Sequence, residues 1–265
     1  FFKITQEDVI SNFDKVLMAQ EGPFPGLPTI GKQLLIERAY NKDCKVILEA
    51  QGGDDIAGGY KYIFASHLKD LLNKKKFKKL ISEVMSFKKV ENETFVNILK
   101  GIINSSKGYQ NGNVSADGSN NYFENLFQKN FLNSNKNKYY EEVLEKIESE
   151  GINTNLKKFI FRDIFFCKLQ RILKSCDRSS MSNSKELRVP LLDHNIVEYF
   201  FSLPENYLIN NGNLRYIYRL FAYKFFGIKT SFKKKKYISD PQTKLLKNEL
   251  FDWAYDTLNS STNLY

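Results

Sequence analysis

The chain has 265 residues, of which 42% are hydrophobic and 26% charged, a composition typical of a globular protein with a large core. Three cysteines without CxxC spacing and two histidines argue against a disulfide scaffold and a Cys/His zinc site. The sequence contains no apolar run of about 18 residues and does not open on a signal-peptide pattern. We therefore expect a cytoplasmic protein with no membrane partner.

The formal net charge of +10 raises the question of a nucleic-acid partner. The lysines lie in short runs, such as Lys74–Lys76 and Lys233–Lys236, on the polar side of amphipathic stretches. Without interleaved aromatic and basic residues, this pattern is typical of a solvated surface, and we expect no nucleic-acid partner. A noncatalytic basic helical module remains an alternative, which strongly salt-dependent RNA binding would favour.

The chain opens on a predicted helix, since a capping-box pattern at Thr5 is followed by apolar residues at helical spacing to about Ala19. Prolines make residues 21–29 irregular, and a second helix is expected over Ile30–Lys42. A short buried strand, Lys45–Glu49, then leads into a glycine-rich acidic turn and an aromatic helix. That order is typical of an α/β layer, and we expect no other clear strand.

Beyond this turn the pattern is nearly all helical. Helices are predicted over Tyr60–Lys76, Phe77–Phe87, Phe95–Ile103, Lys138–Glu150, Asn155–Cys176, Asn195–Phe201, Leu214–Phe226 and Thr243–Leu258. A polar segment that is poor in apolar residues, 108–122, is expected to be mobile. The expected fold class is therefore α/β, mostly helical, with a short parallel-sheet portion.

The turn after the strand surrounds two carboxylates with four glycines: Gly52, Gly53, Asp54, Asp55, Gly58 and Gly59. Glycines permit positive φ and let backbone amides approach an anion closely. Adjacent carboxylates repel unless a cation lies between them or a helix amino terminus shares their charge, and Mg²⁺ on a nucleotide suits that position. The alternative is a plain glycine turn in which one aspartate is a helix N-cap. The pattern is neither a Walker A loop nor GxGxxG.

Three segments resemble the asparagine synthetase family, in family order. LEAQGGDDIAGGY, Leu48–Tyr60, resembles the family loop L-S-G-E/Q-G-A/G-D-E-x-x-G-G-Y, with Asp55 for Glu and Ala50 for Gly. Upstream, QEGPFPGLPTIGKQLL resembles the family's acidic-Pro-Phe segment. Downstream, DRSSMSNSKELRVPLLDH is similar to D-R-x-S-M-x-x-S-x-E-x-R-V-P-F-L-D-H.

The downstream motif carries five supporting charged residues around a Ser-rich turn: Asp177, Arg178, Glu186, Arg188 and Asp193. Charges this close to an apolar segment need partners, so we expect ion pairs such as Glu186 with Arg188 or Arg178 with Asp193. Such a network either braces the domain or contacts substrate directly, and the residues alone leave both roles open.

A fourth segment, FKKKKYISDP, is similar to the family's R-x-K-M-G-F-x-x-P motif and places Lys235 on its catalytic lysine, to within one residue. By itself, a KKKK run is typical of a solvated surface. In the family register, a cation here would neutralise the charge of an acyl-adenylate under attack.

The resemblance implies a partial synthetase domain of the ATP-pyrophosphatase, adenine-nucleotide α-hydrolase-like, superfamily. Residues 1–60 would end its α/β nucleotide-binding part, and residues 61–265 would form its mainly helical part. ATP, Mg²⁺, a carboxylate substrate and ammonia from a glutaminase domain are implied, and a homodimer is compatible with it. The family's S-G-G-x-D-S pyrophosphate loop does not occur in the sequence, so we expect this chain to be inactive alone.

The resemblance implies a role for each residue that matches a family motif. Four loop residues would bind ATP and pyrophosphate: Gly52, Gly53, Asp54 and Asp55. Asp54 would also hold Mg²⁺, and Tyr60 lies on a motif tyrosine that works with an acidic residue in cyclising relatives. Gln51 stands where asparagine synthetases proper have Glu, and glutamine cannot take a proton. We therefore expect an asparagine-synthetase-like amide-forming enzyme of unknown acceptor, with a β-lactam-synthetase-like cyclising ligase as the alternative.

Overall fold

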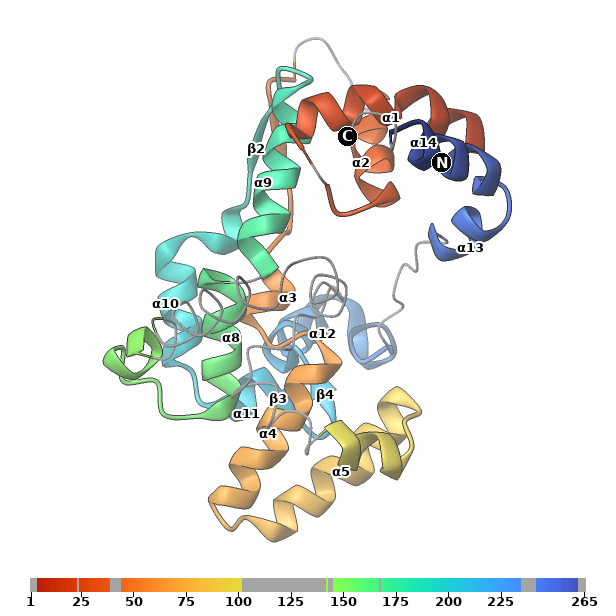
Figure 1. Cartoon of the computed structure of the whole chain (residues 1–265). Helices are drawn as coiled ribbons and strands as arrows, with labels where there is room; N and C mark the ends of the chain where they lie inside the picture. The colour runs from red at the N-terminus through yellow and green to blue at the C-terminus, as the bar shows by residue number, and fades with distance from the viewer. Residues whose placement is uncertain are drawn as a thin grey trace. The chain divides into compact units, whose positions relative to one another are not determined.

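The computed structural model describes residues 4–22, 24–38, 44–101, 142, 145–166, 168–234 and 242–261. The segment 108–122, predicted to be mobile, lies outside the described residues. The chain forms two compact units (Figure 1). Unit 1 comprises Phe1–Glu49, Arg171–Arg188 and Lys236–Tyr265, and unit 2 comprises Ala50–Gln170 and Val189–Lys235.

Unit 1 is built mainly from helices α1 (Gln6–Gln20), α2 (Leu27–Arg38), α13 (Gln242–Lys247), α14 (Phe251–Ser261) and all but the first turn of α9 (Lys168–Met181). The predicted capping box is confirmed: the Thr5 hydroxyl accepts from the Asp8 amide at 3.1 Å, and the Asp8 carboxylate accepts from the Thr5 amide at 3.0 Å. α2 begins three residues earlier than expected, because Pro28 lies in its first turn, where a proline needs no hydrogen-bond donor.

The core of unit 1 is apolar and formed from both ends of the chain. Its buried residues are Val9, Val16, Leu27, Ile30, Leu34 and Leu250, and Phe13, Phe24 and Trp253 pack against them. The single helix predicted over 243–258 is two helices, α13 and α14, and the fully buried Leu250 lies in the break between them.

Unit 1 also holds a two-stranded parallel sheet of β1 (Val46–Leu48) and β2 (Glu186–Arg188), with Ile47 opposite Leu187. β1 confirms the predicted strand, but it is half-buried instead of buried, and Leu48 is 71% exposed. The expectation of no further strand was wrong, because β2 is too short to show a period of two in the sequence.

Unit 2 comprises α3 (Gly53–Ile56), α4 (Lys61–Asn73), α5 (Phe77–Glu91), α8 (Asn155–Phe165), a 3₁₀ turn (Pro190–Leu192), α10 (His194–Ser202), α11 (Glu205–Leu208), β3 (Ile209–Asn210), β4 (Asn213–Leu214) and α12 (Tyr216–Ser231). Residues 95–101 and 145–149 are also helical. α4 packs on α8 (Figure 1), and the Asp70 carboxylate of α4 caps α8 by accepting from the amides of Asn155 (2.8 Å) and Leu156 (2.9 Å). This cap fixes the start of the helix whose far end approaches the glycine turn.

The long helix predicted over 155–176 is two helices, since α8 ends at Phe165 and α9 begins at Lys168. At the end of α8, the rings of Phe165 and Phe166 lie near Phe161, with centroids 4.6 and 5.9 Å away. After the break, Lys168 lies in the interior of unit 2, where its side chain is 8% exposed.

β3 and β4 form a hairpin that the sequence analysis missed, and its signal was present as Asn211-Gly212 between short apolar segments. Both turn residues have positive φ, 49° and 68°. The buried Glu83 carboxylate of α5 accepts from both turn amides, at 2.9 and 2.7 Å. Among the described helices, none has the length and apolar character needed to cross a membrane.

Candidate functional site

The glycine turn forms one helical turn, α3, at the start of unit 2. Gly52 is its N-cap, with φ 85° in the left-handed region. Asp54 and Asp55 both lie inside the first turn. The alternative in which one aspartate is the N-cap is therefore wrong, because a glycine takes that strained position at no steric cost.

Gly52 and Gly53 make room for the downstream motif. A Cβ on Gly52 would lie 2.2 Å from the Leu192 side chain, and one on Gly53 would lie 2.7 Å from Leu191. Two of the family-like motifs therefore meet in unit 2. The loop glycines are required for this packing whether or not they also contact a ligand.

Asp54 pairs with Arg215, the N-cap residue of α12, which lies 161 residues later in the chain. The Arg215 guanidinium donates to its carboxylate at 2.8 Å, and both side chains are about a quarter exposed, 27% and 26%. A Cβ on Gly59 would lie 2.8 Å from the Asp54 carboxylate and 2.9 Å from the Arg215 side chain. Gly59 thus leaves the space in which this ion pair forms.

Asp55 faces a different cation in the interior. Its side chain is 1% exposed and lies 3.4 Å from the Lys168 ammonium, which is 3.1 Å from the centroid of the Tyr60 ring. Burial raises the pKa of Asp55 and lowers the pKa of Lys168, while the attraction between the two charges opposes both shifts. The two carboxylates, expected to share one cation, each contact a basic side chain of the protein.

A second layer supports Tyr60. Its ring stacks on Tyr62 at 5.5 Å, and the Tyr62 hydroxyl donates to Asp163, which also accepts from the Arg162 guanidinium at 2.8 Å. Burial and the nearby carboxylates raise the pKa of both tyrosines, so their hydroxyls stay protonated. The Asp55 carboxylate is among the groups that raise the pKa of Tyr60, so the motif tyrosine lies near an acidic residue.

Tyr218 adds an unpaired polar group beside the loop. Its hydroxyl is buried, and no described residue forms a hydrogen bond with it. A Cβ on Gly53 would lie 3.8 Å from this oxygen. Burial, together with the negative charge of Asp54, raises the pKa of Tyr218 to about 12, although Arg215 acts in the opposite direction.

The side chains around the loop can be compared with those that a Mg²⁺ ion requires. Among the described residues there is no group of three or more His, Cys, Asp or Glu side chains that could hold a metal ion. Mg²⁺ in nucleotide sites takes one or two carboxylates, with phosphates and waters completing its coordination. A partly exposed Asp54 beside the unpaired Tyr218 hydroxyl fits that requirement when phosphate comes with the metal.

Of the two ion pairs predicted for the downstream motif, the structure contains one. Glu186 and Arg188 do form an ion pair, at 2.8 Å, but both side chains are more than half exposed. The pair Arg178–Asp193 was wrong, since Arg178 contacts the Glu21 carboxylate and Asp193 accepts from the Asn195 amide at 2.9 Å as the N-cap of α10. Glu186, Arg188, Arg178 and Asp193 thus each have a structural partner.

Three predicted site residues remain: Gln51, Asp177 and Lys235. Gln51 is half-buried in the turn before α3, and Asp177 is exposed on α9. Lys235 lies outside the described residues. Its neighbour Lys234 donates to the Glu91 carbonyl at 2.8 Å.

Sequence reasoning missed four residues of this site: Lys168, Asp163, Arg215 and Tyr218. Arg215 and Lys168 lie 161 and 113 residues from their aspartate partners. Only Lys168 gave a local signal, because it is a cation that directly follows the apolar run Ile164–Cys167.

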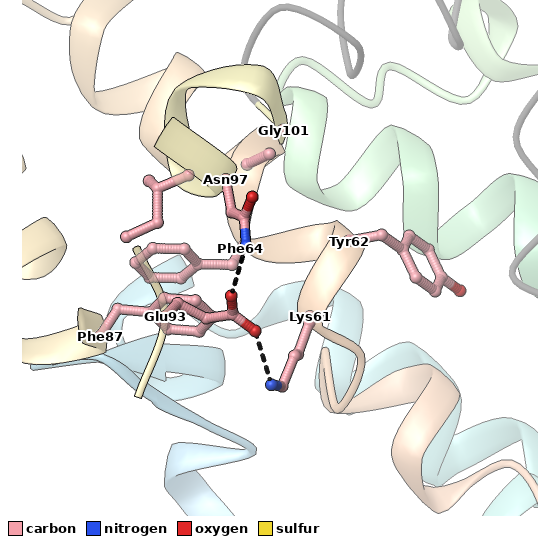
Figure 2. A pocket seen from close by; sticks show the side chains of 9 residues that line it. Lys61, Tyr62, Phe64, Phe87, Glu93, Asn97 and Gly101 are labelled. Atoms are coloured by element: carbon pink, nitrogen blue, oxygen red, sulfur yellow. Dashed lines mark hydrogen bonds and ion pairs between the residues drawn. The ribbon is translucent and has the colours of Figure 1, made fainter. Parts of the chain in front are cut away.

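A pocket of about 220 Å³ lies on the other side of the start of α4, and Figure 2 shows the side chains that line it. Lys61 points to Glu93 at 2.9 Å, and Asn97 donates to the same carboxylate at 3.3 Å. Phe64 and Phe87 stack at 3.7 Å to form an apolar wall. Because its charged groups pair with one another, the pocket itself offers mainly apolar contacts.

Comparisons with known proteins agree with the motifs. A family model described as "Asparagine synthase" matches residues 1–264. The chain is 24% identical over 263 residues to asparagine synthetase [glutamine-hydrolyzing] 1 of Bacillus subtilis (strain 168), covering 97% of this chain and 40% of the relative. It is 24% identical over 206 residues to asparagine synthetase [glutamine-hydrolyzing] 3 of the same organism, covering 76% and 27%. The chain thus spans less than half of each relative, and no solved structure matches it.

Proposed function

Because the chain belongs to the asparagine synthase family, we propose that it is the synthetase part of an ATP-dependent amide-forming enzyme. A carboxylate oxygen of the substrate would attack the α-phosphorus of ATP, and pyrophosphate would leave. Ammonia, released from glutamine by another domain, would then attack the acyl carbon of the adenylate, and AMP would leave. The observation that carries this proposal is the loop of Asp54, a partly exposed carboxylate on a glycine-rich turn.

The residues of the loop have separate tasks in this proposal. Asp54 would hold Mg²⁺, which when bound neutralises phosphate charge. Gly52 and Gly53 let the backbone lie close to the intermediate. Asp55 is buried against Lys168 and so supports the loop from inside, a task different from the phosphate contact that the family resemblance implied.

Lys235 is proposed to stabilise the negative charge of the adenylate during attack. Gln51 lacks the carboxylate that could accept a proton from ammonia, and this difference favours an acceptor other than aspartate. The acceptor would be a carboxylic acid that is activated in the same way.

The test is ATP–pyrophosphate exchange in the full-length protein that carries this chain. Asp54→Ala and Lys235→Ala are each expected to lower the exchange rate by about a hundredfold or more, the usual loss for one charge-stabilising group. Lys224→Ala, which removes an exposed lysine of α12, is the matched control and should leave exchange unchanged. Exchange retained in both Asp54→Ala and Lys235→Ala would exclude this function.

Product analysis then identifies the type of amide. Mass spectrometry after incubation with ATP and glutamine should show a product that contains glutamine-derived nitrogen. A product that forms without glutamine and has lost water would instead indicate an intramolecular, cyclising ligase.

A further inference from the structure

Three reactive side chains meet in unit 1: Lys32 of α2, Cys176 of α9 and Glu49, which follows β1. The Lys32 ammonium lies 2.6 Å from the Cys176 sulfur and 2.6 and 2.7 Å from the two oxygens of the Glu49 carboxylate. Cys176 forms no disulfide with any described residue. An amine and a thiol that are 144 residues apart in the chain thus lie within bonding reach of each other, and the proposed function uses neither.

The surroundings of Cys176 decide which reagents reach its sulfur. Cys176 is 4% exposed, whereas the side chains of Lys32 and Glu49 are 25% and 27% exposed. A small oxidant such as hydrogen peroxide can therefore approach along Lys32, while burial keeps out a bulky thiol such as glutathione. A neighbouring ammonium also stabilises a thiolate, which is the form of cysteine that attacks peroxide.

Oxidation of Cys176 gives a product that Lys32 can capture. The sulfur attacks one peroxide oxygen, the O–O bond breaks, and a sulfenic acid and water form. Glu49 accepts a proton from the Lys32 ammonium, and the neutral nitrogen then attacks the sulfur, as in other condensations of sulfenic acids with nitrogen. The S–O bond breaks, an S–N bond forms, and the hydroxide leaves as water. One thiol, one amine and one peroxide thus give one S–N bond and two waters, with sulfur oxidised and peroxide reduced.

We propose that Lys32 and Cys176 form a peroxide-dependent modification site, in which a covalent S–N bond joins the two side chains. A thiol reductant attacks the sulfur and releases the lysine amine, and a second thiol then restores Cys176. The bond ties α2 to α9 within unit 1. It also removes the positive charge that Lys32 offers to Glu49, the residue two positions before Gln51 in the chain. This inference does not depend on the proposed function.

The test treats the full-length protein that carries this chain with hydrogen peroxide and analyses a tryptic digest by mass spectrometry without reducing agent. The expected product joins peptide 16–38, uncleaved at Lys32, to peptide 175–178, which contains Cys176. Its mass should be about 2 Da below the sum of the two unmodified peptides, because two hydrogens are lost. Dithiothreitol should release both peptides at their unmodified masses.

Lys32→Arg separates the capture step from the oxidation step. Arginine keeps a positive charge beside Cys176, but its guanidinium stays protonated and supplies no nucleophilic nitrogen. This variant should form no joined peptide, and dimedone should trap Cys176 as the sulfenic acid. Lys15→Arg changes the lysine of another ion pair, with Glu37, and is the matched control that should keep the joined peptide. Cys44→Ser, which removes an exposed cysteine, should keep it as well.

Trp253 packs against the core of unit 1, so its fluorescence gives a second measurement in the unsubstituted protein. A bond between residues 32 and 176 restricts the unfolded chain, so the urea midpoint should rise after peroxide and return after dithiothreitol. Cys176 that stays a thiol, or that stops at sulfenic or sulfinic acid while trypsin still cleaves at Lys32, would overturn the proposal. A joined peptide about 14 Da heavier than its parts would retain one oxygen, and the S–N bond would be wrong.

Discussion

Asp54 and Asp55 are adjacent in the sequence, yet they differ in solvent exposure and in partner. The Asp54 side chain is 27% exposed and pairs with Arg215, whereas the Asp55 side chain is 1% exposed and pairs with Lys168. Successive residues of a helix point about 100° apart, so a single turn can present one carboxylate outward and bury the next. One pair is partly open to solvent, and the other is buried beneath the loop.

The buried pair gives a stability prediction. Lys168→Met should lower the free energy of unfolding by about 3 kcal/mol or more, because it leaves the Asp55 carboxylate buried without its cation. The double variant Asp55→Asn/Lys168→Met removes both charges and should recover part of that loss. Urea unfolding followed by circular dichroism measures both values. Equal stability of the single variant and the wild type would contradict the prediction.

His67 gives a pH prediction. Its imidazole is 3% exposed, and no described residue hydrogen-bonds either ring nitrogen. Burial lowers its pKa; the carboxylates of Glu83, Asp70 and Glu205 oppose this shift, and the ammonium of Lys79 adds to it. The unfolded chain therefore binds a proton at higher pH than the folded protein does. This contribution to stability is complete above about pH 6.5 and falls by up to about 1.4 kcal/mol per pH unit below it.

The measurement is the free energy of unfolding between pH 7.5 and pH 5. His67→Leu should flatten this dependence relative to the wild type, since leucine does not titrate. His194→Gln, which replaces the 77% exposed imidazole on α10, is the matched control and should keep the wild-type slope. A wild-type slope in His67→Leu would assign the acid sensitivity to other groups.

At the scale of elements, short-range geometry and packing act together in the β3–β4 hairpin. Asn211-Gly212 has positive φ at both positions, as a two-residue turn between twisted strands requires. A Cβ on Gly212 would lie 2.3 Å from the backbone nitrogen of Phe87, and a backbone atom cannot move aside as a side chain can. The turn therefore packs directly against the backbone of α5, and only glycine fits at this contact.

Gly212→Ala should therefore destabilise the protein by about 2 kcal/mol or more, because both backbone strain and a clash with α5 oppose the folded state. Asn211→Gly is the matched control and should cost much less, since glycine accepts the same φ. Thermal unfolding of the two variants checks the difference. Similar melting temperatures would contradict the prediction and would mean that α5 shifts to make room for the added methyl group.

At the scale of the molecule, unit 1 gathers three separate segments of the chain, and the first and last of them form its apolar core. Trp253, the only tryptophan in the sequence, packs against that core, with its ring centroid 5.1 Å from that of Phe13. Its fluorescence therefore reports on unit 1. Circular dichroism reports on the helices of both units.

Leu250→Ala tests whether the units unfold separately. Truncating a fully buried leucine should cost about 2–5 kcal/mol within unit 1. If the units unfold independently, the urea midpoint detected by Trp253 fluorescence falls more than the midpoint detected by circular dichroism. Phe221→Ala, at a 64% exposed side chain in unit 2, should move neither midpoint. Coincident shifts in Leu250→Ala would show one cooperative transition.

Much of the fold could be predicted from local patterns. The capping box at Thr5, the strand before the glycine turn and most helices follow from interactions within about four residues, which periodicity and caps record. The breaks near Phe166 and Asn248 and the strand β2 could not be predicted. They depend on which distant residues fill the interior, and the local helical pattern runs through both breaks.

The sequence by itself determined the family and the glycine-rich loop, because motif spacing and residue chemistry are local properties. Only the tertiary structure decided that Arg215 holds Asp54 and that Lys168 holds Asp55. It alone also placed the Tyr218 hydroxyl beside Gly53. These partners lie more than 100 residues from the loop, so packing and burial bring them there, and no spacing in the sequence encodes their contact.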